Sequence, residues 1–201
     1  MKIGMRWKTA FPLLLLAVCT PSSNQLSKNE ESGSQQENRV SASGLEAVSQ
    51  LKPTPGGAVE GIVSLREADG ELQIIAHVAG LLAGRHGLHI HKTVDCSLPD
   101  LEEHFNPHQS RHGGPTLPEH HVGDLGNIEA DGNGIAHLEM TVNFATLSEG
   151  TNSILGLAII VHSEEDDLQT QPDGGSGLAL ACGIIELARP LSSPSEGSGT
   201  Y

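Results

Sequence analysis

One segment of the chain has unusual chemistry for its composition. Residues 104–124, HFNPHQSRHGGPTLPEHHVGD, contain five histidines, Asp124 and three prolines, but few aliphatic side chains. Such a segment cannot bury enough apolar surface to order itself. Because imidazole and carboxylate groups bind divalent metals, a bound ion can replace the missing apolar core.

Further histidines lie where they can join this segment. His89 and His91 are two residues apart in HIH, so on a strand their side chains share one face. His162 follows an apolar run, at the mouth of a long loop. The candidate metal ligands are therefore His89, His91, His104, His112, His121, Asp124 and His162. Any one of them can instead be a solvated surface side chain, but chance explains the whole set poorly.

The types of these ligands limit the metal. All are imidazoles or a carboxylate, with no unpaired thiolate nearby, which favours Zn(II) and Cu(II) over an iron–sulfur cluster. A set of histidines with one aspartate suits tetrahedral zinc. A set made of imidazoles alone suits copper.

Eight short segments predict the strands that position these residues. They are 45–52, 58–67, 71–80, 87–92, 122–130, 134–142, 154–163 and 178–188, and no segment predicts a convincing helix. ADG at 68–70 and DGNG at 131–134 predict hairpin turns. We therefore expect an all-β, eight-stranded antiparallel sandwich or barrel. Its two long connections, 92–122 and 163–178, are expected to be functional.

The ends of the chain predict export. Residues 1–19 have the basic start and short apolar run of a signal peptide, too short to span a membrane. LAVC at 16–19 is similar to a bacterial lipobox, so Cys19 is a candidate for lipidation, with ordinary cleavage nearby as the alternative. Residues 20–43 predict a disordered tether, 44–188 the folded domain and 189–201 a disordered tail.

Cysteine count and charge set further limits. If Cys19 is an anchor, Cys96 and Cys182 remain, and an even pair in an exported chain predicts a disulfide. Two free buried thiols are the alternative. The formal charge of -14 excludes nucleic acid as a partner, because binding it needs a basic surface.

Several motifs resemble the copper/zinc superoxide dismutase family. GLHIHK, HFNP, HGGP, HVGDLGN, VHSEEDDL and LACG occur in the family's order over about residues 45–187, and the spacings from His104 to His112 and from His112 to His121 also agree. The resemblance implies a Greek-key barrel with one copper and one zinc per chain. Together with the predicted signal peptide and the lipobox-like LAVC, it predicts an exported bacterial type located in the periplasm or cell envelope, anchored to a membrane by lipid.

The resemblance assigns a role to each matching position. It implies copper ligands His89, His91, His104 and His162, and zinc ligands His104, His112, His121 and Asp124. His104 would be shared between the metals. Asp166 would hydrogen-bond ligands of both, His86 would pin backbone beside the copper, and Cys96 would pair with Cys182. We expect His77 and His137 to be surface or hairpin-pair residues, and His108 and His120 to be solvated loop residues with an accessory metal role as a lesser alternative.

The implied reaction is conversion of superoxide to oxygen and hydrogen peroxide, with His104 supplying a proton. One departure bears on it: the family usually carries an arginine three residues before the second cysteine, where this chain has Ala179. No lysine or arginine occurs between Val161 and Ile185, and without residues 1–19 the chain has 8 basic against 25 acidic residues. The alternative function is therefore a copper store or sink that has lost the guiding cation. The sequence leaves the oligomeric state undetermined.

Overall fold

The computed structural model describes residues 44–97 and 103–188, which form an all-β structure. Its strands are β1 Leu45–Pro53, β2 Glu60–Ala68, β3 Glu71–Ala79, β4 Gly84–His91, β5 Asp124–Ala130, β6 Ile135–Val142, β7 Ala158–His162 and β8 Ala179–Leu187. All eight predicted strands are present, although β4 begins earlier and β7 later than predicted. Within the described residues, no helix is long and apolar enough to cross a membrane. The predicted signal peptide, Cys19, tether and tail lie outside these residues.

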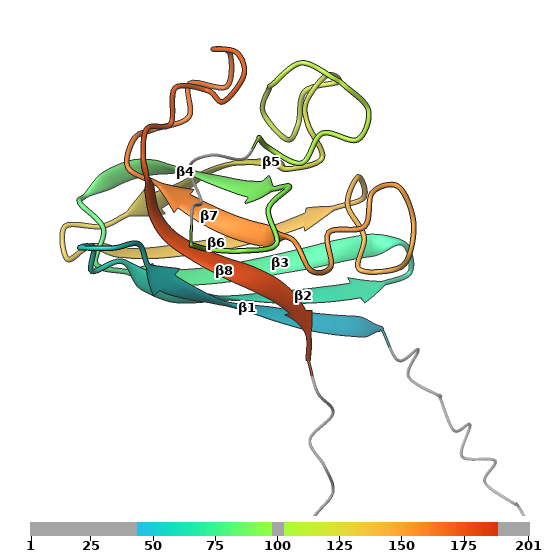
Figure 1. Cartoon of the computed structure of the whole chain (residues 1–201), viewed down its shortest axis with the longest axis horizontal. Helices are drawn as coiled ribbons and strands as arrows, with labels where there is room; N and C mark the ends of the chain where they lie inside the picture. Colours follow the sequence, from blue (N-terminus) through green and yellow to red (C-terminus); the bar gives the residue numbers. More distant parts are fainter. Residues whose placement is uncertain (1–43, 98–102, 189–201) are drawn as a thin grey trace, which may run out of the picture. The chain divides into compact units, whose positions relative to one another are not determined.

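The strands close into an antiparallel barrel in the order β1-β2-β3-β6-β5-β4-β7-β8, with β8 pairing back onto β1 (Figure 1). This confirms the predicted fold class. The predicted hairpin turn between β2 and β3 is present, with Asp69 and Gly70 both at positive φ, as a tight turn of this kind requires. The pairs β3–β6 and β4–β7 join strands that are distant in the sequence, which is the connectivity of a Greek key.

The burial of β4 and β7 differs from that of β1, β2 and β3. β1, β2 and β3 alternate buried and exposed residues, because one face packs in the barrel and the other meets solvent. All five residues of β7 are buried, as are the last six of β4. Leu88 and Ile90 belong to the barrel core. The alternation of β4 therefore places His89 and His91 on its other face, where they are also buried.

Candidate metal centre

Two neighbouring strands bring three of the candidate ligands together. His89 lies opposite Ile160 and His91 opposite Ala158 in the β4–β7 register, so the outer face of β4 meets that of β7. His162 is the last residue of β7 and shares a face with Ile160. The Nε2 atoms of His91 and His162 are 3.2 Å apart. The strand periodicity thus places these imidazoles on one face, and the loop after β7 also holds two of them, through Asp166 at His89 and through the Gly177 carbonyl, 3.2 Å from His162 Nδ1.

Backbone hydrogen bonds bring His104 from the long loop to β4. Phe105 N–H donates to the Ile90 carbonyl at 2.7 Å, and Ile90 N–H donates to the Gly123 carbonyl at 2.8 Å. His91 and His104 also form an isolated antiparallel bridge. Gly123 is required here, because a Cβ at this position would overlap the Ile90 carbonyl and lie 2.8 Å from Phe105 N.

Asp124 organises the remaining ligands. Its Oδ2 accepts hydrogen bonds from the backbone N–H groups of His121, at 2.7 Å, and Gly113, at 3.1 Å. Its Oδ1 faces three imidazole Nδ1 atoms: His104 at 2.7 Å, His112 at 3.1 Å and His121 at 3.2 Å. One carboxylate oxygen is therefore held by the backbone while the other converges with three ring nitrogens.

The structure thus contains two groups of buried ligands that share one residue. We call His89, His91, His104 and His162 the all-histidine cluster, and His104, His112, His121 and Asp124 the aspartate-containing cluster. Within each, one ligand atom per residue lies within 4.8 Å of all the others. The structure brings all seven predicted ligands together in this way. Because His104 belongs to both groups, it can present one ring nitrogen to each.

Unpartnered nitrogens show that these residues suit metal ions. His89 Nδ1 and His104 Nε2 are buried without a hydrogen-bond partner, and the buried Nδ1 atoms of His112 and His121 face Asp124 Oδ1, an oxygen that His104 Nδ1 also approaches. Leaving a buried polar atom unpaired costs roughly 1–3 kcal/mol, so His89 Nδ1 and His104 Nε2 each need a partner that the protein does not supply. The donor sets are imidazole alone in one cluster and imidazole with one carboxylate in the other. These sets can hold copper and zinc respectively.

Asp166 hydrogen-bonds one histidine of each cluster. Its Oδ2 accepts a hydrogen bond from His89 Nε2 at 2.8 Å, and its Oδ1 accepts one from His112 Nε2 at 2.9 Å. Because these contacts occupy Nε2, the Nδ1 atom of each ring is the nitrogen available to bind a metal. A Cβ at position 174 would overlap Asp166 Oδ1 and lie 2.7 Å from His112 Nε2, so only Gly174 fits against this contact.

Burial and hydrogen bonding move the pKa values of this centre in opposite directions. Burial, with the nearby charges of His104 and His162, lowers the pKa of His89 to about 3 against the opposing hydrogen bond to Asp166. Burial alone would also lower the pKa of His112, but its contacts with Asp124 and Asp166 raise it to about 10. Burial raises the pKa of both aspartates, yet hydrogen bonds from the surrounding histidines hold each well below its usual range. His89 is therefore a neutral ligand, whereas a cation must displace a proton from His112.

The residues around the clusters bear out several predictions. His86 is buried, and its ring nitrogens lie 2.9 Å from the carbonyl oxygens of His162 and Leu82, so it braces the backbone of a cluster residue. His120 also lies outside both clusters, but it is half-buried rather than solvated as predicted, because its Nδ1 donates to the His121 carbonyl and its ring packs against Phe144. Cys96 and Cys182 form the predicted disulfide.

The remaining three histidines, His77, His108 and His137, have partners. His108 is exposed, and its Nε2 lies 2.7 Å from Asn152 Oδ1. His77 and His137 are exposed and lie opposite each other, but on β3 and β6, which are not joined as a hairpin. Their pairing follows from the Greek-key order, which the hairpin hypothesis did not anticipate.

A cavity gives access to both clusters from the surface. It is lined by His91, Glu103, His104, Asn106, Ser110, His121, His162, Gln171, Pro172 and Asp173. Glu103 and Asp173 are acidic, and among these lining residues there is no lysine or arginine. Arg85, near the start of β4, forms an ion pair with Glu165. Ala179 is buried and lies opposite His162 in the β7–β8 register, beside the all-histidine cluster.

Sequence reasoning missed two residues that hold the loops together. Gln171 Oε1 accepts from His112 N–H at 2.8 Å, and Gln171 Nε2 donates to the His112 carbonyl at 2.9 Å. Asn127 makes the equivalent pair of contacts with the backbone of Asp166, at 2.8 and 2.9 Å. Gln171 carries no signal in the sequence, whereas Asn127 lies in the HVGDLGN motif and was open to notice.

Comparison with known proteins agrees with this geometry. Residues 59–185 match the family model described as copper/zinc superoxide dismutase. The chain is 38% identical over 144 residues to superoxide dismutase [Cu-Zn] 5 of Dictyostelium discoideum, covering 67% of this chain and 94% of that protein. It is 34% identical over 143 residues to the extracellular superoxide dismutase [Cu-Zn] of Brugia pahangi, covering 66% and 71%. It is 37% identical over 133 residues to the protein of the same name from Caenorhabditis elegans, covering 62% and 60%. These relatives are eukaryotic and give the predicted bacterial type no support.

Proposed function

Because the chain belongs to the copper/zinc superoxide dismutase family, we propose that it is an enzyme that converts two superoxide ions and two protons into oxygen and hydrogen peroxide. One superoxide is oxidised and the other reduced, so no further oxidant or reductant is needed. The names of the three relatives support this activity. We assign copper to the all-histidine cluster and zinc to the aspartate-containing cluster, one ion each per chain.

The observation that carries this proposal is the sharing of His104 between two complete ligand sets. A protein that used zinc only to order its loop would have no need of His89, His91 and His162, which lie buried around an unpartnered nitrogen of His104. Copper, when bound, supplies two accessible oxidation states, whereas zinc has one. The arrangement therefore suits redox chemistry beside a site that fixes the shared imidazole.

The residues of the chain orient the metal-binding imidazoles and supply a proton. Asp124 Oδ1 holds His104 Nδ1 at 2.7 Å, which orients the ring and leaves Nε2 as the atom that can hold and release a proton. His104 lines the access cavity, so this proton can reach a molecule bound there. Asp166 orients His89 and His112 through their Nε2 atoms, as outer carboxylates do for metal-binding imidazoles.

The direct test is superoxide consumption by protein loaded with one copper and one zinc per chain. We expect the loaded protein to be active, and His162→Gln to lose copper binding and activity together. The exposed His108→Gln is the matched control and should keep both. Protein that binds two zinc ions but takes up no copper on titration would contradict the proposal.

A copper store is the alternative, and the acidic access cavity is the observation that favours it. Glu103 and Asp173 at the cavity repel an anionic substrate and attract a cation. The relatives' names favour the enzyme. Copper-loaded protein that consumes superoxide no faster than free buffer would decide for the store.

We also propose that the protein is exported and anchored through Cys19. The Cys96–Cys182 disulfide suits an oxidising compartment, and two of the relatives are named extracellular. We expect native protein to fractionate with membranes and to carry a lipid mass that Cys19→Ser lacks. A lipid mass that persists in the Cys19→Ser protein would contradict the anchor.

A further inference from the structure

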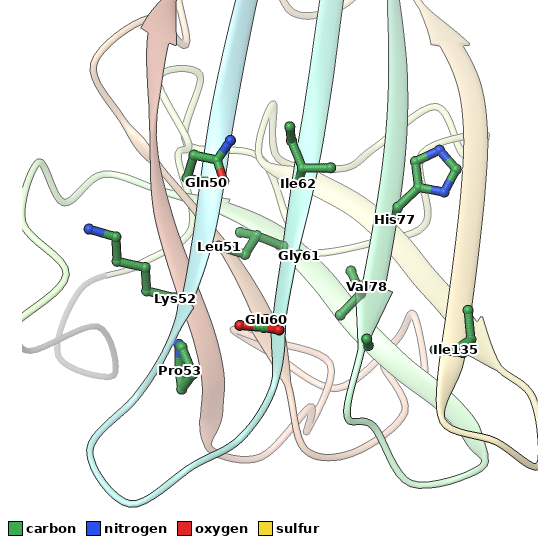
Figure 2. A pocket seen from close by; sticks show the side chains of 11 residues that line it. Gln50, Leu51, Lys52, Pro53, Glu60, Gly61, Ile62, His77, Val78 and Ile135 are labelled. Atoms are coloured by element: carbon green, nitrogen blue, oxygen red, sulfur yellow. The ribbon is translucent and has the colours of Figure 1, made fainter.

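A pair of histidines lies outside both clusters, on the outer surface of the barrel. His77 on β3 and His137 on β6 are directly opposite each other, and both are exposed. Their Nδ1 atoms are 3.2 Å apart and their ring centroids 4.5 Å apart. His77 also lines an open groove with Gln50, Lys52, Glu60, Ile62 and Ile135, and Figure 2 shows it projecting from the outer face of its strand. The proposed reaction uses neither residue.

We propose that His77 and His137 form a separate surface site for a divalent transition-metal ion that prefers imidazole, zinc(II) or copper(II). An ion bound to two imidazoles at about 2.0–2.1 Å, with an angle near 100° between them, holds their nitrogens roughly 3.1 Å apart. The observed 3.2 Å between the Nδ1 atoms matches this spacing. Because the rings are exposed, a small rotation of each aims both lone pairs at one ion.

The pairing of β3 with β6 fixes the spacing between His77 and His137. The pair lies within the continuous β3–β6 register that runs from Leu72 opposite Val142 to Ala79 opposite Ile135. The two backbones are therefore fixed, and binding an ion orders only the side-chain rotamers of two imidazoles. A ligand pair that is already close loses less conformational entropy on binding than one that must be assembled.

The surroundings of the pair suit a cation. Glu139, diagonally across from His77 in the register, is exposed and its Oε1 accepts a hydrogen bond from Gln73 Nε2 at 2.9 Å. Glu60 and Lys52 both line the groove that His77 borders, so their charges offset each other and Glu139 is the acidic group that favours a cation at the pair. Exposure leaves room for water in the remaining coordination positions. The alternative is a hydrogen bond between the two imidazoles, which solvent competition would make weak.

Equilibrium dialysis of the fully metallated protein against zinc chloride tests the site. We expect one further zinc per chain beyond the two central ions. His77→Gln and His137→Gln should each weaken its binding by more than about tenfold, because even losing the outer partner of a ligand costs roughly 10–100-fold. His108→Gln, which removes an exposed histidine elsewhere, should leave it unchanged.

Two readouts keep the result independent of folding in the variants. The content of central copper and zinc should be unchanged in every variant, because neither histidine touches the clusters. In the unaltered protein, zinc should shift the imidazole NMR signals of His77 and His137 and leave those of His108 in place. Absence of the further zinc, or its full retention in the doubly substituted protein, would overturn the proposal.

Discussion

Replacing Asp166 by asparagine should uncouple the two clusters while preserving shape. Asp166 Oδ1 accepts from both His112 Nε2, at 2.9 Å, and the backbone N–H of Leu168, at 2.7 Å, whereas Oδ2 accepts only from His89 Nε2, at 2.8 Å. An amide has one oxygen and one NH2 group, and placing NH2 at the Oδ1 position would oppose it to two donors. The amide oxygen therefore stays there, and NH2 faces His89.

The consequence falls on His89. Because Nε2 of His89 then faces an NH2 group, it can only accept a hydrogen bond, and the ring must carry its proton on Nδ1, the nitrogen that is buried without a hydrogen-bond partner. A proton on this atom competes directly with a metal. Losing an outer-shell partner costs about 10–100-fold in affinity, or about 1.4–2.8 kcal/mol. We expect Asp166→Asn to lower copper affinity by this amount and zinc affinity by less.

Competition with a chelator of known affinity measures both losses, and the nitrogen-15 shifts of His89 report the tautomer. Asp167→Asn is the matched control, because it neutralises the neighbouring exposed carboxylate, which hydrogen-bonds Thr170 and Gln169 instead. Copper affinity within threefold of that of the control, or a larger loss of zinc than of copper, would refute the reasoning about His89.

Three further predictions concern pH, the disulfide and the cavity. In metal-free protein the pKa of His112 is raised to about 10, so its bound proton stabilises the fold fully below about pH 6.5. Between about pH 6.5 and pH 10 the free energy of unfolding should therefore fall by at most about 1.4 kcal/mol per pH unit. Denaturant titrations of His112→Asn should show that this slope is abolished. Replacing Cys96 and Cys182 by serine should cost about 4–5 kcal/mol in the chain-entropy model, since the bridge spans 86 residues, and a loss under 1 kcal/mol by urea unfolding would contradict this. Glu103→Gln and Asp173→Asn should each raise kcat/KM for superoxide about twofold at low salt, because each removes a charge that lines the cavity. The factor corresponds to roughly 0.4 kcal/mol of repulsion between two unit charges about 10 Å apart in water. A native rate that already falls steeply with added salt would contradict the repulsion.

The sequence determined the features that depend on local periodicity. Alternation on β4 put His89 and His91 on one face, opposite Leu88 and Ile90, and the position of each strand followed from short apolar runs between turns. The low apolar content of 104–124 pointed to a metal-ordered loop. The family motifs then separated His121 from His120 and paired Asp166 with both clusters.

Tertiary structure decided the features that depend on contacts between distant segments. The closed strand order sets β3 beside β6 and so brings His77 to His137, a contact that spans 60 residues. The same order folds 163–178 over the clusters, where Gln171 holds His112 and Arg85 is engaged by Glu165. Local residue patterns specify which face a side chain occupies. Which faces meet depends on how all the strands pack together, because each long-range register is selected by the burial of the whole core.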